Sequence, residues 1–287
     1  MKILKKIKRE VTIGLSKLCL KKTRVNYLGL DLKVPVLYGM GSGYFVPAEL
    51  WMGDCMKIFL EQKEGAVIDI GANVGVYLVK LRVWDRERSY YGFEPNQACT
   101  FYCQELIRMN KFRNSFIFPF ALSDNPGIRT LHAKDRSDKG GTIHLFAKDN
   151  TENLDYSFDA AVMQGDSVID TLDLDKMSVI KVDVEGAELE VLAGLKGTIG
   201  KFRPFIYCEI LLPPHESDPA FEEIYRRRDQ IFRLLLGLDY TIIGRTHSGE
   251  LTQINNAEEL DNKFDENFIC SPKENLAELT EKLKLIE

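Results

Sequence analysis

The sequence predicts an α/β fold in which seven strands form a mostly parallel sheet with helices on both faces. Three observations predict it. A continuous apolar segment at 66–70 runs directly into a glycine-rich turn. Apolar strand patterns alternate with helical patterns along most of the chain, which is typical of a parallel sheet covered on both sides. The segment 178–192 repeats the order of strand, turn and helix, this time with an acidic turn.

The expected elements follow in order. A helix over 44–64 leads into the sheet, and residues 23–43 are irregular or form a short hairpin. We divide the chain into an N-terminal segment and connector (1–43), one domain (44–272) and a C-terminal helix (273–287). The expected strands lie near 66–70, 89–93, 115–120, 178–183, 204–210, 240–245 and 267–270, with helical patterns between them at 98–110, 187–195 and 220–237.

Composition restricts the class of protein. The 287 residues, of which 45% are hydrophobic and 28% charged, are enough to bury one substantial core. The net charge of −5 argues against a nucleic-acid binder, which needs a basic surface for phosphate contacts. The six cysteines contain no Cys-x-x-Cys pair, and the four histidines lack the spacing of zinc ligands. No apolar run is long enough to span a bilayer, so we expect a cytoplasmic protein.

The turn after the first expected strand has the residues of a cofactor site. Gly71 and Gly75 lack a Cβ and let backbone N–H groups approach a ligand closely. Glu94 lies nineteen residues further on, at the end of the next strand, where a carboxylate can accept both hydroxyls of a ribose. Two glycines alone would fit a plain strand-to-helix turn, but Asp69, Asn73 and Glu94 around them favour a cofactor site. The spacing lacks the tight pyrophosphate turn of NAD enzymes and favours a nucleoside without a diphosphate, S-adenosylmethionine (SAM).

Four blocks of the sequence carry a family resemblance. The run Lys-Val-Asp-Val-Glu-Gly-Ala-Glu is the most specific, and with the other three it resembles the FkbM family of SAM-dependent methyltransferases over roughly Phe45 to Pro272. The resemblance implies a class I methyltransferase (Rossmann-like) fold whose last two strands form an antiparallel edge. It also implies methylation of a hydroxyl, often on a sugar or a polyketide-like product. The blocks occur in the family's order, at 69–75, 93–96, 121–124 and 181–188.

By the same resemblance, Ser123 and Asp124 are expected near the adenine of SAM. The turn from Gly71 to Gly75 is expected to pack against the amino-acid end of the cofactor.

Methyl transfer to a hydroxyl needs a base, because a neutral hydroxyl is a poor nucleophile. Asp183 ends the fourth strand, Glu185 lies in the turn after it and Glu209 ends the fifth strand. Since the carboxyl ends of parallel strands share one edge, we expect these three candidates to face one cleft. The same carboxylates could also bind magnesium, so a metal is left open. Glu188, one turn further on, is expected instead to cap the helix or to pair with a cation.

Two histidines are weaker candidates for the base. His215 follows the fifth strand and His144 lies in the long segment from Asp124 to Ser178, and both are supported by their titration range alone. That segment has no clear periodicity, and we expect an irregular stretch. It is either a substrate-contacting loop or a plain surface insertion with a short extra strand or two.

Residues 1–22 form a basic amphipathic segment in an acidic chain. Leu4, Ile7, Val11, Leu15 and Leu18 fall on one helical face, and the remaining positions are rich in lysine and arginine. Such a helix can lie in a membrane interface, at the inner surface of the cell membrane, or dock on the domain itself or a second copy. A cleaved signal peptide is disfavoured because Lys17 interrupts the apolar stretch.

The sequence thus favours a SAM-dependent O-methyltransferase whose partner is a small-molecule or glycan acceptor and not a nucleic acid. A catalytically silent scaffold with a SAM fold is the main alternative, and self-association is left open. A nicotinamide oxidoreductase is weakened by the missing third glycine.

Overall fold

The computed structural model describes most of the chain. The first twenty residues lie outside the described part, so the expected N-terminal helix is not covered, and neither are His144 and His215. The described ranges are 21–37, 39–47, 50–133, 156–211, 221–260 and 263–284.

A central sheet of eight strands organises the described residues. Its order is β12 (Leu251–Ile254), β11 (Tyr240–Thr246), β13 (Phe264–Pro272), β10 (Phe205–Glu209), β9 (Met177–Val182), β3 (Ala66–Ile70), β4 (Tyr90–Phe93) and β5 (Ser115–Phe118). The five strands from β10 to β5 run parallel, and β13 is antiparallel to both β10 and β11. The antiparallel edge is confirmed, but the expected count of seven omitted β12, a four-residue strand at the outer edge.

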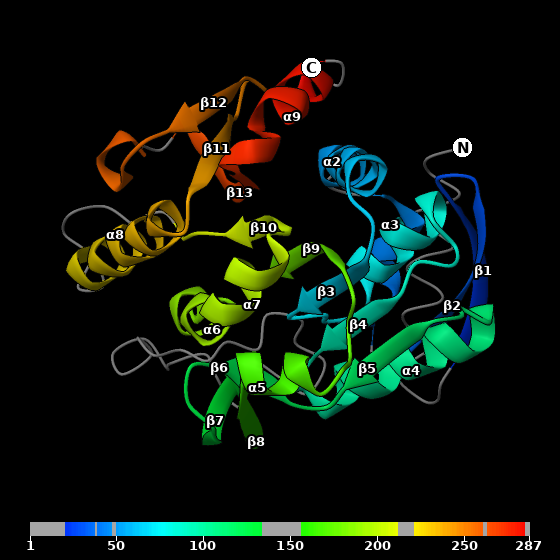
Figure 1. Cartoon of the computed structure of the whole chain (residues 1–287). Coiled ribbons are helices and arrows are strands. Elements are labelled where there is room, and N and C mark those ends of the chain that lie inside the picture. Colours follow the sequence, from blue (N-terminus) through cyan, green and yellow to red (C-terminus); the bar gives the residue numbers. More distant parts are fainter. Residues whose placement is uncertain are drawn as a thin grey trace.

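Helices cover both faces of this sheet, as expected (Figure 1). Successive residues of a strand point to opposite faces, so Val67 joins one hydrophobic core and Ile68 the other. The Val67 core is shared with α2 (Leu50–Gln62), α3 (Val76–Trp84) and α9 (Leu276–Leu283). The Ile68 core is shared with α5 (Gly165–Asp170), α6 (Glu188–Gly194), α7 (Lys196–Phe202) and α8 (Phe221–Gly237).

The helix expected over 44–64 begins later. A 3₁₀ turn, η1 (Ser42–Phe45), comes first, and α2 starts only at Leu50. Pro47 lies between them, and a residue that precedes a proline is disfavoured in the helical region. Val46 is accordingly extended, with φ −134° and ψ 107°.

The region before α2 contains the hairpin that was one of the two expected alternatives. β1 (Lys21–Tyr27) pairs antiparallel with β2 (Leu30–Val36). Leu28 and Gly29 both have positive φ, as a two-residue type I′ hairpin turn requires. The hairpin packs on α4 (Gln97–Asn110), where the Asn110 side chain accepts from the Lys33 N–H at 2.8 Å and donates to the Lys33 carbonyl at 2.7 Å. Figure 1 shows the blue hairpin beside α4 at one side of the molecule.

The segment from Asp124 to Ser178 is more regular than expected in its described parts. β7 (Gly127–Ala133) and β6 (Ala121–Ser123) both pair with β8 (Tyr156–Gln164), and α5 follows directly. The described ends of the segment are therefore regular, not irregular, and agree with the alternative of an insertion that contains a short extra strand or two. The alternation of apolar and polar residues in β7 is hard to see in the sequence, because apolar residues occur on both faces of the strand: Ile128 is 66% exposed whereas Leu131 is buried.

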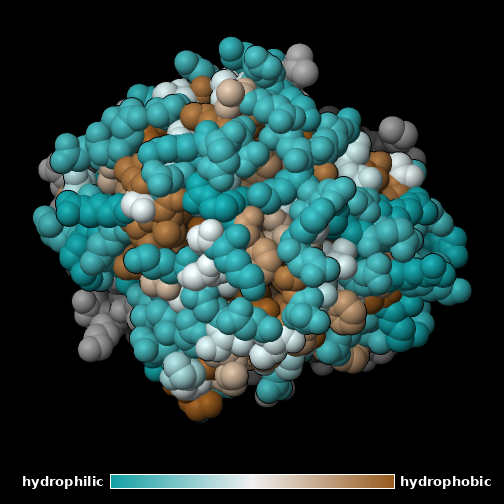
Figure 2. All heavy atoms as spheres, in the orientation of Figure 1, coloured by the Kyte–Doolittle hydropathy of each residue, from teal (hydrophilic) through white to brown (hydrophobic). Residues whose placement is uncertain are grey.

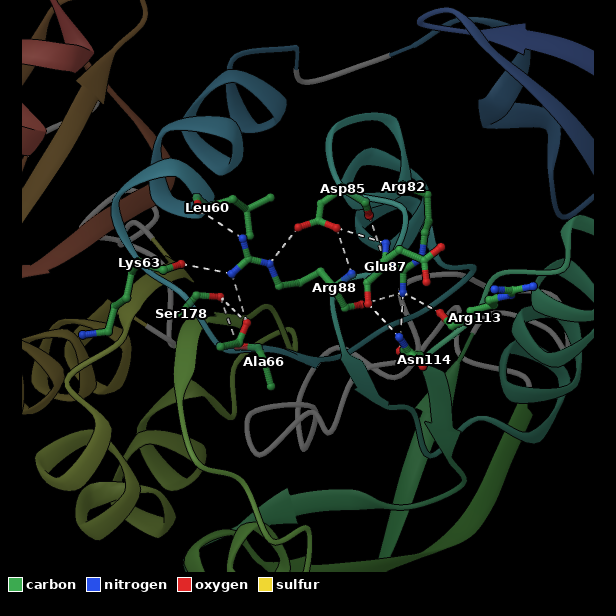
Figure 3. Close-up of polar contacts among 11 residues, drawn as sticks. Leu60, Lys63, Ala66, Arg82, Asp85, Glu87, Arg88, Arg113, Asn114 and Ser178 are labelled. Atoms are coloured by element: carbon green, nitrogen blue, oxygen red, sulfur yellow. Dashed lines mark hydrogen bonds and ion pairs between the residues drawn. The ribbon is translucent and has the colours of Figure 1, made fainter.

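Two arginines stabilise the amino end of the sheet (Figure 3). The guanidinium of the buried Arg82 donates to the carbonyls of Asp85, Arg88 and Arg113 and to Ser115 Oγ. Arg88 in turn donates to the Asp85 carboxylate at 2.9 Å and to carbonyls in the last turn of α2 and in the α2–β3 connection. Each guanidinium donates to several backbone carbonyls at once and so ties separate segments together. This network is structural, because it lies at the sheet edge opposite the carboxyl ends.

The surface is mixed in character. The face seen in Figure 2 is largely hydrophilic, with apolar atoms in separate patches. Among the described helices, none has the length and apolar character needed to cross a bilayer.

Candidate functional site

A cavity opens at the carboxyl ends of β3, β4 and β9. Its walls combine apolar groups with a few carboxylates, which is the usual composition of a small-molecule site. The position is also the switch point of the sheet, because β4 and β5 follow on one side of β3 and the chain then crosses to β9 on its other side. We call it the first cavity. It is lined by Ile70, Gly71, Asn73, Phe93, Glu94, Pro95, Asn96, Cys99, Ala121, Leu122, Leu131, Asp183, Val184, Glu185, Ala187 and Val191.

Glu94 is the best-defined polar group of the first cavity. Its side chain is buried, and its two oxygens accept separate backbone bonds, from the Asn73 N–H at 2.8 Å and the Asn96 N–H at 2.7 Å. Burial raises the pKa of Glu94 to about 7, although these two hydrogen bonds lower it. A carboxylate has about four acceptor sites, so each oxygen retains one for a ligand hydroxyl. Two acceptor sites of Glu94 are thus available to ligand groups in the first cavity.

The glycine-rich turn brings two strand ends together. Gly71 has φ 80°, and a Cβ there would lie 1.8 Å from the Asp183 carbonyl oxygen, so only glycine fits. Asn73, with φ 51°, lines the cavity and presents its N–H to Glu94. Gly75 is not a lining residue: it precedes α3, and a Cβ there would crowd Leu106. Gly75 therefore serves the turn and its packing.

Ser123 and Asp124 were expected near the adenine, and neither lines the first cavity. Their neighbours Ala121 and Leu122 do, because both are buried where β6 passes the cavity. The Ser123 hydroxyl instead donates to the exposed Asp124 carboxylate at 3.0 Å. The third sequence block therefore reaches the first cavity through its apolar residues, Ala121 and Leu122.

The three predicted acidic residues meet in one cluster. Asp183, Glu185 and Glu209 each offer a carboxylate oxygen within 4.8 Å of the others. Burial, followed by repulsion from Asp183 and Glu185, raises the pKa of Glu209 to about 9, so this carboxyl is protonated at neutral pH. Glu185 has φ 54°, an unusual conformation for a residue with a Cβ. Three carboxylate oxygens suit a hard divalent cation, which would relieve the repulsion among them. Without a cation, the proton on Glu209 relieves that repulsion.

Glu188 is the first residue of α6, and its side chain bonds to the turn that precedes the helix. Its buried carboxylate accepts from the Val184 and Gly186 N–H groups, which lie just before α6. Burial raises the pKa of Glu188 to about 7 in spite of these bonds. Glu188 therefore organises the acidic turn and does not line either of the two cavities described here.

Lys181 is a site residue that sequence reasoning missed. It is buried in β9, and its ammonium contacts the Gly71 carbonyl at 2.7 Å, Asp183 at 3.1 Å and Asp69 at 3.3 Å. Burial alone would lower the pKa of Lys181, but the two carboxylates raise it overall. Asp69 itself is fully buried and accepts from the Tyr90 hydroxyl at 2.5 Å, so it positions Lys181 and does not line either cavity. The signal in the sequence that could have identified Lys181 is a single charged residue within an otherwise apolar strand.

A second cavity of about 230 Å³ adjoins the first. Gly71, Asn73 and Asp183 line both cavities, so they form the boundary between the two. Glu185 lines only the first cavity, and Glu209 lines neither. The remaining walls of the second cavity are Tyr27, Gly43, Tyr44, Met52, Ala72, Val74, Val76, Tyr77 and Lys181.

Several known methyltransferases are similar to this chain. Methyltransferase 1 of Beauveria bassiana is 23% identical over 53% of this chain and 66% of its own length. The 2-O-methyltransferase NoeI of Sinorhizobium fredii is 28% identical over 52% and 65%, and the hexuronic acid methyltransferase AglP of Haloferax volcanii is 27% identical over 55% and 61%. The chain thus spans less than two thirds of the length of each of these relatives. The solved methyltransferase FkbM from Methylobacillus flagellatus is 17% identical, with a TM-score of 0.45 over 72% of this chain and 43% of that one.

The family model of the methyltransferase FkbM domain matches residues 69–234, which is more than half of the chain. The match includes all four sequence blocks that carried the resemblance. Together with the order of the central sheet, it confirms the expected class I methyltransferase fold. The chain belongs to the FkbM methyltransferase family.

Proposed function

We propose that this protein is a SAM-dependent O-methyltransferase that acts on a hydroxyl of a sugar, a glycan or a related metabolite. The observation that carries the proposal is the position of Asp183. This residue lines the first cavity, which contains Glu94, and also the second cavity. A base between a cofactor and an acceptor must occupy such a boundary.

The first cavity fits the cofactor. Glu94 has two acceptor sites for the ribose hydroxyls, and the apolar groups of Phe93, Ala121 and Leu122 suit the faces of an adenine. Gly71 allows close approach of the backbone on the side of the acidic turn. When bound, SAM supplies a methyl group that is activated by a positively charged sulfur.

The chain's own residues have the tasks of positioning and proton removal. Asp183 accepts the proton of the acceptor hydroxyl, and Lys181 fixes its carboxylate from 3.1 Å. Glu209, protonated at neutral pH, keeps the cluster from accumulating three negative charges. A divalent cation on the same oxygens would take over that compensation.

Two relatives support the acceptor class. One is named as a 2-O-methyltransferase and another as a methyltransferase of hexuronic acid. Both names describe those proteins. They support an oxygen acceptor on a sugar, which for this chain is a proposal.

The experiment has two parts that separate an enzyme from a silent scaffold. Calorimetry with S-adenosylhomocysteine (SAH) measures cofactor binding, and labelled SAM incubated with fractionated cell extract identifies a methylated product by mass spectrometry. Binding together with a labelled O-methyl sugar supports the proposal. Binding without transfer to any fraction supports the scaffold, and no binding refutes both.

A further inference from the structure

The second cavity differs from the first in where its walls come from. Tyr27 ends β1, Gly43 and Tyr44 belong to η1, and Met52 lies in α2. All four precede residue 69, where the match to the FkbM domain begins. Part of the wall of the second cavity is thus supplied by β1, η1 and α2, which lie outside the matched segment.

This wall is held in place. The Tyr44 hydroxyl donates to the Val74 carbonyl at 2.6 Å and so ties η1 to the glycine-rich turn. The rings of Tyr27 and Tyr44 pack edge to face, with centroids 5.7 Å apart. Both tyrosines and Met52 are at least nine-tenths buried. The cavity is therefore preformed, and its volume of about 230 Å³ is far above the ~10–15 Å³ that one water needs.

The charges of the second cavity are matched. Among its described lining residues, Lys181 is the only cation and Asp183 the only anion. Lys181 has three N–H bonds and three oxygen neighbours, on Gly71, Asp183 and Asp69. It retains no proton for an anionic ligand. An acidic acceptor would bring a second negative charge close to Asp183 without a new partner.

One buried polar group in the wall does lack a partner. Tyr77, in the first turn of α3, is 4% exposed, and its hydroxyl has no hydrogen-bond partner among the residues that the structure describes. Buried hydroxyls are normally bonded, so the Tyr77 hydroxyl in this cavity wall is available to bond a ligand hydroxyl.

We propose that the second cavity is the acceptor site and that it selects a neutral pyranose over an anionic one, with Tyr77 as a hydrogen-bonding specificity residue. The proposal rests on the proposed function and adds the substrate class. Tyrosine rings and Met52 pack against the apolar faces of the sugar ring, and the few polar groups fix the hydroxyls. The acceptor hydroxyl then lies beside Asp183, at the boundary with the first cavity.

The test uses NMR of the full chain labelled with [methyl-¹³C]methionine and saturated with SAH. Met52 is the reporter, and its resonance is identified by its loss in Met52→Leu. The probes are neutral methyl hexopyranosides of gluco, galacto and manno configuration, each compared with its uronic acid. A neutral pyranoside is expected to shift the Met52 resonance with saturation, and its uronic acid is expected to bind at least tenfold more weakly.

Two variants examine the site itself. Tyr77→Phe is expected to raise the dissociation constant of the pyranoside about three- to tenfold, the effect of one hydrogen bond, without changing SAH affinity. Gly43→Phe adds a ring where a Cβ meets no atom within 4 Å, at the wall of the cavity, and is expected to abolish the shift. Gly200→Phe is the matched control, because that glycine also has open space but lies in α7 away from both cavities.

The outcomes separate this proposal from the proposed function. Failure of SAH to bind refutes the cofactor site and everything built on it. With SAH bound, the acceptor proposal is overturned if the neutral pyranosides leave Met52 unshifted, or if the uronic acids bind as tightly. It is also overturned if both Tyr77→Phe and Gly43→Phe match the wild-type chain.

Discussion

Replacing Glu94 by glutamine tests the cofactor cavity most sharply. The carboxylate accepts from the N–H groups of Asn73 and Asn96 and keeps one acceptor site on each oxygen. Glutamine turns one oxygen into an NH₂ group, which cannot accept from a ribose hydroxyl and also opposes one of the two backbone N–H groups. A hydrogen bond to a charged group contributes about 1.5–3 kcal/mol. The dissociation constant of SAH should therefore rise about 10- to 150-fold.

The assay is isothermal calorimetry with SAH between pH 5.5 and 8.5. Ribose hydroxyls favour the ionised form of Glu94, whose pKa is about 7, so wild-type affinity should strengthen as pH rises through 7 and then level off. Glu94→Gln should lose that dependence. The control is Glu105→Gln, since Glu105 pairs with Arg108 outside both cavities. A Glu94→Gln affinity within threefold of wild type, or a parallel pH profile, would refute the ribose assignment.

Three further predictions concern other groups. The pKa of Glu209 is about 9 in the folded chain against an ordinary value of 4.5, so its contribution to stability is complete below pH 4.5 and is lost as pH rises through 9. The melting temperature of Glu209→Gln relative to wild type should therefore climb from pH 5 to pH 9, and a constant difference argues against the raised pKa. Lys181→Met leaves the buried Asp69 charge without its cation and should cost about 3–5 kcal/mol in urea unfolding, whereas a loss below about 1 kcal/mol contradicts the pairing. A chain that starts at Thr23 should lose co-sedimentation with anionic vesicles that the full chain shows at low salt, because each basic residue near an anionic surface contributes about 1 kcal/mol; equal behaviour of the two leaves a docked helix.

The sequence predicted those features that depend on local pattern. Parallel strands buried on both faces appear as continuous apolar runs, so β3, β9 and β10 were found within about one residue. The carboxyl ends of such strands share an edge, so Asp183 and Glu209 could be placed together from their positions at strand ends alone. Glu94 was placed for the same reason.

Features that depend on contacts between distant segments were not predicted. Lys181 is informative only once Asp69 is known to lie opposite it in the neighbouring strand. Tyr77 and Met52 are ordinary core residues in sequence, and the walls of the second cavity come from segments far apart along the chain, including the end of β1, η1, α2 and β9. β12 and β7 were not predicted, because short or half-exposed strands show little apolar periodicity in the sequence.

The central claim is that Asp183 removes the acceptor proton at the boundary of the two cavities. The measurement is single-turnover transfer of labelled methyl from SAM to the identified acceptor, for Asp183→Asn and for Asp124→Asn, an exposed carboxylate outside both cavities, as the control. We predict that Asp183→Asn binds SAH like the wild-type chain and transfers methyl about 10²–10⁴-fold more slowly, while the control is unchanged. Wild-type transfer rates in Asp183→Asn at full SAM occupancy would contradict the account.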